Sequence, residues 1–319
     1  MADEAIGADS ADYTVFGLRV RSSLPLPELF PATGCGEADV LIDSGGIEAP
    51  ESTPGLTVAN DGLLLTVPEV GRFLISDGRS IRAEPMNGVD PRNVRLFLLG
   101  SAFGVLLHQR GLLPLHANAI EVDSNAFAFS GASGAGKSTL AAWFHDRGFR
   151  LVADDVCVVR FDSHGKAQAC PGLPRLRLWL DALEKTGRAS AGLHRSYAGS
   201  AAGLDKFDVP LGWETMRSEN IPLRAVYLLD EGESFAISRL RGVEAAQVIF
   251  ENTYRGSYLA AANAHRIHWQ SAVRLAQHTP VFRIARSMRT DRFESECERL
   301  LEHLSSEFSL GATAPTRGG

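Results

Sequence analysis

The chain has 319 residues, a formal net charge of −6, and basic residues that are scattered along its length. This balance argues against a nucleic-acid or anionic-membrane partner, because both favour clustered Lys and Arg. Four cysteines without metal-ligand or redox spacing, and a start without the layout of a signal peptide, lead us to expect reduced thiols and a cytoplasmic protein.

Short apolar stretches separated by turn residues dominate the first 90 residues. A strand followed by a Pro-rich turn is predicted over residues 12–30. Further strands are predicted at 38–43, 56–61, 63–69 and 72–77. We therefore expect residues 1–90 to form a mostly β N-terminal domain that recognises a substrate or partner.

An apolar run at residues 96–107 lies between Arg95 and His108. At about twelve residues it is too short to cross a bilayer. We expect a buried helix over Arg92–Gln109, within a connecting segment that spans residues 91–112.

The pattern of residues 111–131 predicts two paired strands that lead into the segment "GASGAGKST". Gly131, Gly136, Lys137 and Ser138 have the spacing of a P-loop, between a buried strand and a helix predicted over 137–147. Such a loop turns backbone N–H groups toward phosphate oxygens, and the helix N-terminus adds partial positive charge. The motif predicts ATP and Mg²⁺, with Lys137 on the β/γ-phosphates and the Ser138 hydroxyl on the metal. The predicted nucleotide-binding residues are Gly131, Ala132, Ser133, Gly134, Ala135, Gly136, Lys137, Ser138 and Thr139.

Two pairs of acidic residues compete for the place beside this loop. Asp154 and Asp155 interrupt an apolar segment that reads as two strands, whereas Asp230 and Glu231 follow an equally apolar strand. By its position directly after an apolar strand, the second pair better matches the acidic end of a Walker B strand. We favour the first pair, because paired carboxylates within a buried segment need a cation and a nucleotide-bound metal supplies one.

Beyond the acids, the pattern predicts alternating strands and helices. We expect strands near 222–230, 234–240 and 281–285, and helices at 243–252, 266–278 and 291–307. Residues 309–319 are expected to be a disordered tail. His265 and His268 have a spacing seen at metal sites, but the absence of a third ligand nearby in the sequence favours chance.

The segments "LHANAI", "GASGAGKST" and "RGFRLVADDV" together resemble the catalytic domain of the HPr kinase/phosphorylase family, whose P-loop domain is related to that of phosphoenolpyruvate carboxykinase. The resemblance is close over 113–160 and loose over 161–300. It implies an α/β (α+β) fold in which residues 113–308 form a kinase domain of this type.

The resemblance also implies site roles. Asp154 would be the general base toward a serine hydroxyl, and Asp155 and Ser138 would lie by the metal. His116, 21 residues before Lys137, would hydrogen-bond or charge the catalytic carboxylate. The implied catalytic residues are thus Asp154, His116 and Lys137. A further cation near the γ-phosphate is expected, and the candidates are Arg175, Arg177, Lys206 and Arg255.

The chain departs from the family at Thr139, where members that act on HPr usually have glutamate, and it lacks their downstream signature. The whole-chain pattern is more similar to divergent HPr-kinase-like proteins of proteobacteria, some of which phosphorylate a serine on a precursor peptide. The resemblance therefore implies a serine kinase whose acceptor is an HPr-like protein or a peptide, and it leaves phosphorylase activity open. Related kinases assemble as hexamers, so a homo-oligomer is also open.

Two other functions fit the same sequence. One is a non-catalytic or regulatory module in which ATP orders the fold and the N-terminal domain recognises a partner. The other is a small-molecule kinase. The paired aspartates favour a kinase over a regulatory module, because a sensor has little use for a base beside the metal carboxylate.

Overall fold

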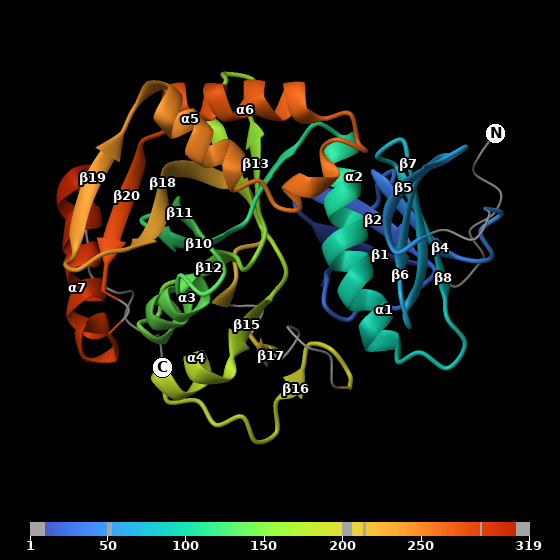
Figure 1. Cartoon of the computed structure of the whole chain (residues 1–319), viewed down its shortest axis with the longest axis horizontal. Helices are drawn as coiled ribbons and strands as arrows, with labels where there is room; N and C mark the ends of the chain where they lie inside the picture. The colour runs from blue at the N-terminus through green and yellow to red at the C-terminus, as the bar shows by residue number, and fades with distance from the viewer. Residues whose placement is uncertain (1–9, 50–52, 200–205, 213–214, 288, 311–319) are drawn as a thin grey trace.

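A computed structural model describes residues 10–49, 53–199, 206–212, 215–287 and 289–310. It has a mixed α/β fold with several sheets, which confirms the predicted fold class at that level (Figure 1). Most of the predicted tail, residues 311–319, lies outside the described residues. Among the described residues, no helix is long and apolar enough to cross a membrane.

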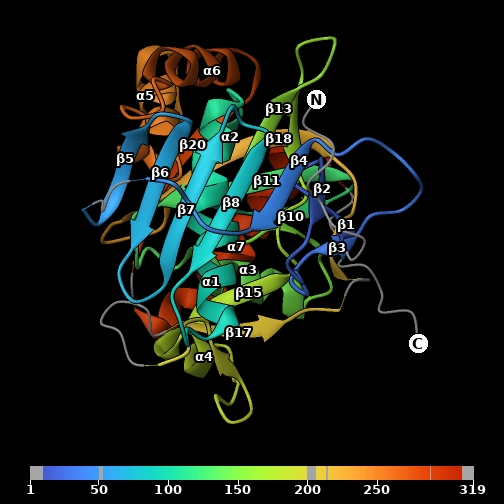
Figure 2. The same cartoon turned by 90° about the vertical axis from the view of Figure 1, so that its right-hand side faces the viewer.

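The N-terminal part forms an eight-stranded sheet in the order β3-β1-β2-β4-β8-β7-β6-β5 (Figure 2). Its strands are β1 (Ala11–Val15), β2 (Leu18–Ser22), β3 (Phe30–Pro31), β4 (Val40–Ser44), β5 (Gly55–Ala59), β6 (Gly62–Val67), β7 (Gly71–Ser76) and β8 (Ser80–Pro85). The predicted first strand is a hairpin of β1 and β2, because Phe16 and Gly17 adopt positive φ and reverse the chain. We did not predict β8, whose outward-facing charged residues weaken its apolar pattern.

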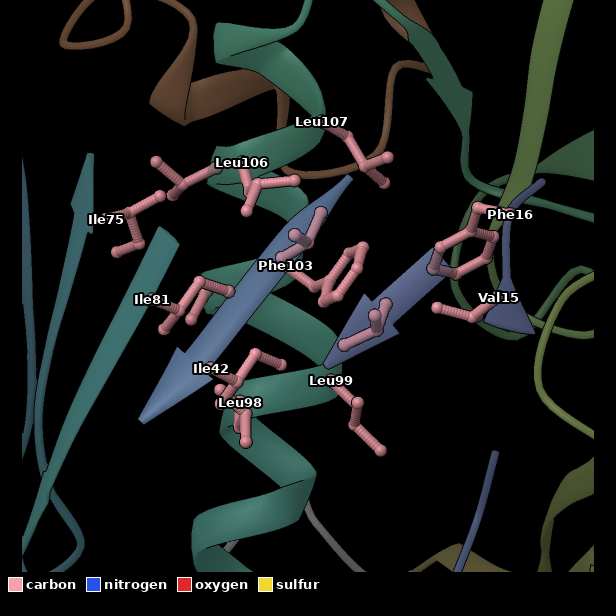
Figure 3. Packing of buried hydrophobic residues seen from close by; sticks show 14 of the residues in the cluster. Val15, Phe16, Ile42, Ile75, Ile81, Leu98, Leu99, Phe103, Leu106 and Leu107 are labelled. Carbon is pink, nitrogen blue, oxygen red and sulfur yellow. The ribbon is translucent and has the colours of Figure 1, made fainter. Parts of the chain in front are cut away.

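One nearly continuous helix covers a face of this sheet. It runs through α1 (Pro91–Phe97), a π-helical segment (Leu98–Ala102) and α2 (Phe103–Gln109), which matches the predicted helix. The Asp90 side chain accepts from the Arg92 N–H at 2.8 Å and fixes the start. Figure 3 shows Phe103 and its neighbours packed against strand residues such as Ile42 and Ile81. The same core continues into Val158 and Tyr254, which belong to the rest of the chain.

The second sheet has nine strands and carries the segment predicted to be a P-loop, which keeps that name below. The path β12-β10-β11-β18-β14-β13-β9 is extended by β20 beside β18 and by β19 beside β20. Its strands are β9 (Leu113–Leu115), β10 (Ala117–Val122), β11 (Asn125–Gly131), β12 (Leu151–Ala153), β13 (Cys157–Phe161), β14 (Ala167–Cys170), β18 (Ile221–Glu231), β19 (Ala236–Leu240) and β20 (Val281–Arg286). β11, β18 and β20 are parallel neighbours, so the ends of these strands meet at one edge beside the P-loop.

Helices cover both faces of this sheet. The helices are α3 (Lys137–Asp146), α5 (Gly242–Glu251), α6 (His265–His278) and α7 (Thr290–Phe308), with a short 3-10 helix at Gly256–Tyr258. Alternate residues of β11 separate the two layers. Phe127 and Phe129 pack with α3 and α7, whereas Ala126 and Ala128 pack with α5 and α6. This alternation anchors the P-loop strand from both sides.

A small third sheet lies next to α3. It comprises β15 (Arg175–Trp179), β16 (His194–Arg195) and β17 (Lys206–Pro210), and the short helix α4 (Leu180–Lys185) follows β15. None of these elements was predicted, nor was β14. The structure therefore adds a wall of the site that the apolar pattern did not reveal.

Candidate active site

The P-loop joins β11 to α3 through three glycines with positive φ. Gly131 has φ of 145°, and a Cβ there would lie 2.6 Å from the Leu229 carbonyl oxygen. Gly136 caps α3 in the left-handed region, with φ of 78°. Both positions exclude larger residues, because a side chain would be strained and would also collide with its neighbours.

Lys137 begins α3 and is buried, with 7% exposed. Its Nζ donates to the carbonyl oxygens of Gly131 at 2.7 Å and Ala132 at 3.0 Å. Burial lowers the pKa of Lys137 to about 8, although the nearby carboxylates of Asp155 and Asp154 oppose the shift. The lysine therefore carries a charge at neutral pH and is held within the loop by groups that phosphate oxygens can replace.

Asp154 follows β12 and has both carboxylate oxygens engaged. Oδ1 accepts from Asn118 Nδ2 at 2.7 Å and lies 3.5 Å from Ser138 Oγ, and Oδ2 accepts from the Arg177 backbone N–H at 2.7 Å. The residue is only 5% exposed. Burial and the adjacent Asp155 charge raise the pKa of Asp154 to about 6. Asp154 thus ties the P-loop serine to the neighbouring strands.

Asp155 turns the other way, because its backbone lies in the left-handed region with φ of 70°. Its carboxylate is 3.6 Å from His116 Nδ1, 3.4 Å from Arg177 Nη1 and 3.8 Å from Lys206 Nζ. Burial alone would raise the pKa of Asp155, but the charges of Arg177, Lys206 and His116 hold it at about 2. Asp155 is therefore ionised at neutral pH. A strained conformation at such a residue is typical of functional sites.

His116 lies between β9 and β10, beside Asp155. Its Nδ1 is 3.1 Å from the Asp155 carbonyl oxygen, so a hydrogen bond there requires the proton on Nδ1. Burial lowers the pKa of His116, partly offset by the charge of Asp155. A neutral imidazole is thus the form expected at pH 7.

One pocket of about 340 Å³ contains these groups. It is lined by His116, Ser133, Gly134, Gly136, Lys137, Ser138, Thr139, Asp155, Trp179, Asp181, Ala182, Lys185, Lys206, Arg286, Ser287, Arg289, Thr290 and Phe293. Asp155 lines it and Asp154 does not. The resemblance implies a base at Asp154 and a metal-side carboxylate at Asp155, but in the structure Asp155 is the one of the two that lines the pocket.

Of the four predicted cations, only Lys206 lines the pocket. Arg177 contacts Asp155 but does not line the pocket. Arg175 does not line it either, and lies 3.8 Å from Asp208. Arg255 stacks near the rings of Tyr254 and Tyr258 and lies outside the pocket.

Sequence reasoning missed two buried residues of the site, Asn118 and Arg286. Asn118 joins the two aspartates, since its Nδ2 donates to Asp154 and its Oδ1 accepts from the Asp155 N–H at 3.2 Å. Its place two residues after His116 was an available signal, because such residues share a face of an extended chain.

The competing sequence signals lie apart from this pocket. Asp230 and Glu231 end β18 and are exposed, with Asp230 Oδ2 3.9 Å from Arg283. His268 is buried, with Nε2 3.2 Å from His108 Nδ1, and His265 is exposed. Within the described part of the chain, no group of three or more His, Cys, Asp or Glu residues is suited to hold a metal.

The free energy of unfolding of Asp154→Asn minus that of wild type is expected to be larger at pH 7 than at pH 4. The folded pKa of about 6 exceeds the ordinary value of 3.8, so this group's stabilising contribution is full below pH 3.8 and is lost as pH rises through 6. Asparagine does not titrate, so the difference in unfolding free energy should grow by up to about 3 kcal/mol over that range. Urea unfolding at both pH values, with a chelator and without nucleotide, measures it. A difference that stays constant with pH would contradict the raised pKa.

The chain is similar to the HPr(Ser) kinase/phosphatase from Coxiella burnetii, with 16% sequence identity and a TM-score of 0.32, over 61% of this chain and 98% of that chain. No protein-family model matches the sequence. No curated protein matches it either. The residues of the site are therefore the basis of the function proposed below.

Proposed function

We propose that this protein is an ATP- and Mg²⁺-dependent kinase that transfers the γ-phosphate to a serine hydroxyl of a protein or peptide. The observation that carries the proposal is the convergence of Lys137, Ser138, Asp155 and His116 on one pocket, with Asp154 bonded beside it. A glycine-rich turn that only resembled a P-loop would have no reason to face a buried pair of carboxylates.

The loop would bind the triphosphate of ATP. Its backbone N–H groups and the start of α3 supply positive potential, and Lys137 would exchange the carbonyls of Gly131 and Ala132 for phosphate oxygens. The pocket volume of about 340 Å³ lies within the usual range of small-molecule sites.

The oxygen donors beside Lys137 fit Mg²⁺, a hard cation that is usually held by one or two carboxylates together with phosphates and water. Ser138 Oγ and Asp154 Oδ1 are 3.5 Å apart, and the buried carboxylate pair needs positive charge. Ser138 lines the pocket and would hold the metal, and Asp154, which does not line it, would orient the Ser138 hydroxyl and supply negative charge beside it. When bound, the metal would neutralise charge that develops on the phosphates.

Asp155 would be the carboxylate that faces the acceptor. The serine oxygen forms a bond to the γ-phosphorus while the bond from that phosphorus to the β,γ-bridging oxygen breaks and ADP leaves. The hydroxyl proton passes to the Asp155 carboxylate and then to solvent. A weak base suffices because proton transfer is late in a loose transition state, so alignment and charge carry most of the acceleration.

His116 would hold Asp155 in place. Its Nδ1 contacts both the carbonyl and the carboxylate of that residue. Neutral His116 would donate to Asp155 without adding a third cation to Arg177 and Lys206, and this contact supports the left-handed backbone of Asp155. A homo-oligomer and a cytoplasmic location stay predictions from the sequence.

Incubation with γ-labelled ATP, Mg²⁺ and serine-bearing proteins or peptides encoded nearby tests the proposal. Label is expected on serine, and it should disappear when that serine is replaced by alanine. Tight ATP binding without transfer to any acceptor would favour the regulatory module instead. Label that appears only on a low-molecular-weight acceptor would favour the small-molecule kinase.

A further inference from the structure

Arg286, the last residue of β20, lies on the P-loop although it is far from it in sequence. It is only 6% exposed and lines the pocket together with Gly134 and Gly136. Its Nη2 donates to the Ala135 carbonyl at 2.5 Å, and a Cβ on Gly136 would lie 2.2 Å from that nitrogen. The guanidinium therefore rests on the backbone that leads into Lys137.

The charge of Arg286 has no close carboxylate. In the part of the chain that the structure describes, no carboxylate oxygen lies within 4.0 Å of its guanidinium, and its buried Nε has no hydrogen-bond partner. Glu296 is the nearby acid, but its Oε1 accepts from the Ser287 backbone N–H at 3.3 Å and its Oε2 is unpartnered. A buried guanidinium with no carboxylate in direct contact costs stability, so its presence at a pocket wall points to an anionic ligand.

The other cations that line the pocket, apart from Lys137 in the loop, are already paired. Lys185 Nζ is 3.5 Å from Asp181, Lys206 Nζ is 3.8 Å from Asp155, and Arg289 Nη2 is 2.9 Å from Asp291. Arg286 differs from them in being both buried and uncompensated. Its planar fork of donors also suits phosphate oxygens, and it can contact two of them at once.

The sheet order fixes the side on which Arg286 lies. Asp155 follows β12, on one side of the P-loop strand β11, whereas Arg286 ends β20, on the other side. The transferable phosphate must point to Asp155, so the remainder of the nucleotide must leave the loop toward β20 and the start of α7. That part of the pocket wall consists of Arg286, Ser287, Arg289, Thr290 and Phe293.

We propose that Arg286 is a second phosphate-binding cation of the ATP site, which contacts the phosphates from the side of the loop opposite Asp155 while the nucleoside leaves along Ser287, Thr290 and Phe293. This inference rests on the proposed function. The bond to Ala135 offers a competing role, in which Arg286 only braces the loop. The two roles differ in what they require: a brace needs an N–H donor, whereas a phosphate ligand needs positive charge.

Titration calorimetry with ATP on wild type, Arg286→Lys and Arg286→Gln separates these roles. The glutamine variant keeps N–H donors without charge, and we expect its Kd to rise by about 10- to 100-fold, the loss typical of a hydrogen bond to a charged group. The lysine variant keeps the charge and should bind more tightly than the glutamine variant. Arg283→Gln is the matched control, because that arginine lies on the same strand but outside the pocket and is paired with Asp230 and Glu244, and its Kd should stay within about threefold of wild type.

Thermal unfolding without nucleotide gives an independent readout. Loss of an uncompensated buried charge should leave the melting temperature of Arg286→Gln equal to or above that of wild type. A brace depends only on an N–H donor that reaches the Ala135 carbonyl, so it would leave the two variants with equal ATP affinity, and it would lower the melting temperature only where the shorter side chain fails to reach that carbonyl. That pattern, or unchanged ATP binding by Arg286→Gln, would overturn the inference. If wild type itself binds no ATP, the proposed function fails before Arg286 is tested.

Discussion

Asp155→Asn is expected to slow phosphoryl transfer by about 10²- to 10⁴-fold while ATP binding is retained. The substitution removes the proton acceptor that faces the pocket. It should preserve the backbone, because asparagine tolerates the left-handed conformation that Asp155 adopts at φ of 70°. Single-turnover transfer of labelled phosphate measures the chemical step, and calorimetry with ATP measures binding separately.

Asp181→Asn provides the matched control for this substitution. Asp181 lines the same pocket, but its side chain is largely exposed and lies 3.5 Å from Lys185 on the same helix. Its loss should change the transfer rate by only a few fold. Asp154→Asn should mainly raise the Mg²⁺ concentration needed for activity. Wild-type transfer by Asp155→Asn combined with an inactive Asp154→Asn would restore the roles that the family resemblance implies.

Lys137→Met is expected to weaken ATP binding by more than about 100-fold and to abolish detectable transfer. Methionine keeps much of the apolar stem but not the ammonium, so the phosphates lose their central cation. The carbonyls of Gly131 and Ala132 also lose their donor, which should destabilise the protein by about 1–3 kcal/mol. Urea unfolding without ATP, followed by titration with ATP, measures both effects.

Lys185→Met removes another lysine of the same pocket and serves as the comparison. Lys185 is paired with Asp181 and lies on α4 rather than on the loop, so its loss should leave ATP affinity within a few fold of wild type. Equal losses of affinity in the two variants would mean that the pocket attracts phosphate through its general charge. Lys137 of the P-loop would then contribute no more to ATP binding than any other lysine of the pocket.

Local patterns were enough to predict the elements that surround the P-loop. The strand before Gly131 and the helix after Lys137 are set by short-range signals, namely apolar alternation, glycines at required conformations and a helix-forming run. The break at Asp154 and Asp155 between two strands was equally visible. The same holds for the helix at residues 91–109, which Asp90 caps and Pro91 begins.

Contacts between segments that are far apart in the sequence determine the elements and site residues that sequence patterns did not predict. β15 was hidden because Pro171 and Pro174 precede it and its charged residues alternate with leucines that face α3. Arg286 reaches the loop only through the parallel pairing of β18 with β20. The different directions of the two aspartates arise from the backbone conformation of Asp155, which no residue pattern specifies. Sequence thus identified the acids but not which of them faces the pocket.

The parallel arrangement of β11, β18 and β20 also has a consequence for how the protein is made. The P-loop strand β11 ends at residue 131, whereas its parallel neighbour β18 is complete only at residue 231 and β20, which pairs with β18, at residue 286. At ribosomal elongation rates, roughly 10–30 s separate the emergence of the loop from that of β20. A nascent chain halted before β20 therefore carries the motif without Arg286, and under the proposed function it would bind ATP less tightly than the full chain.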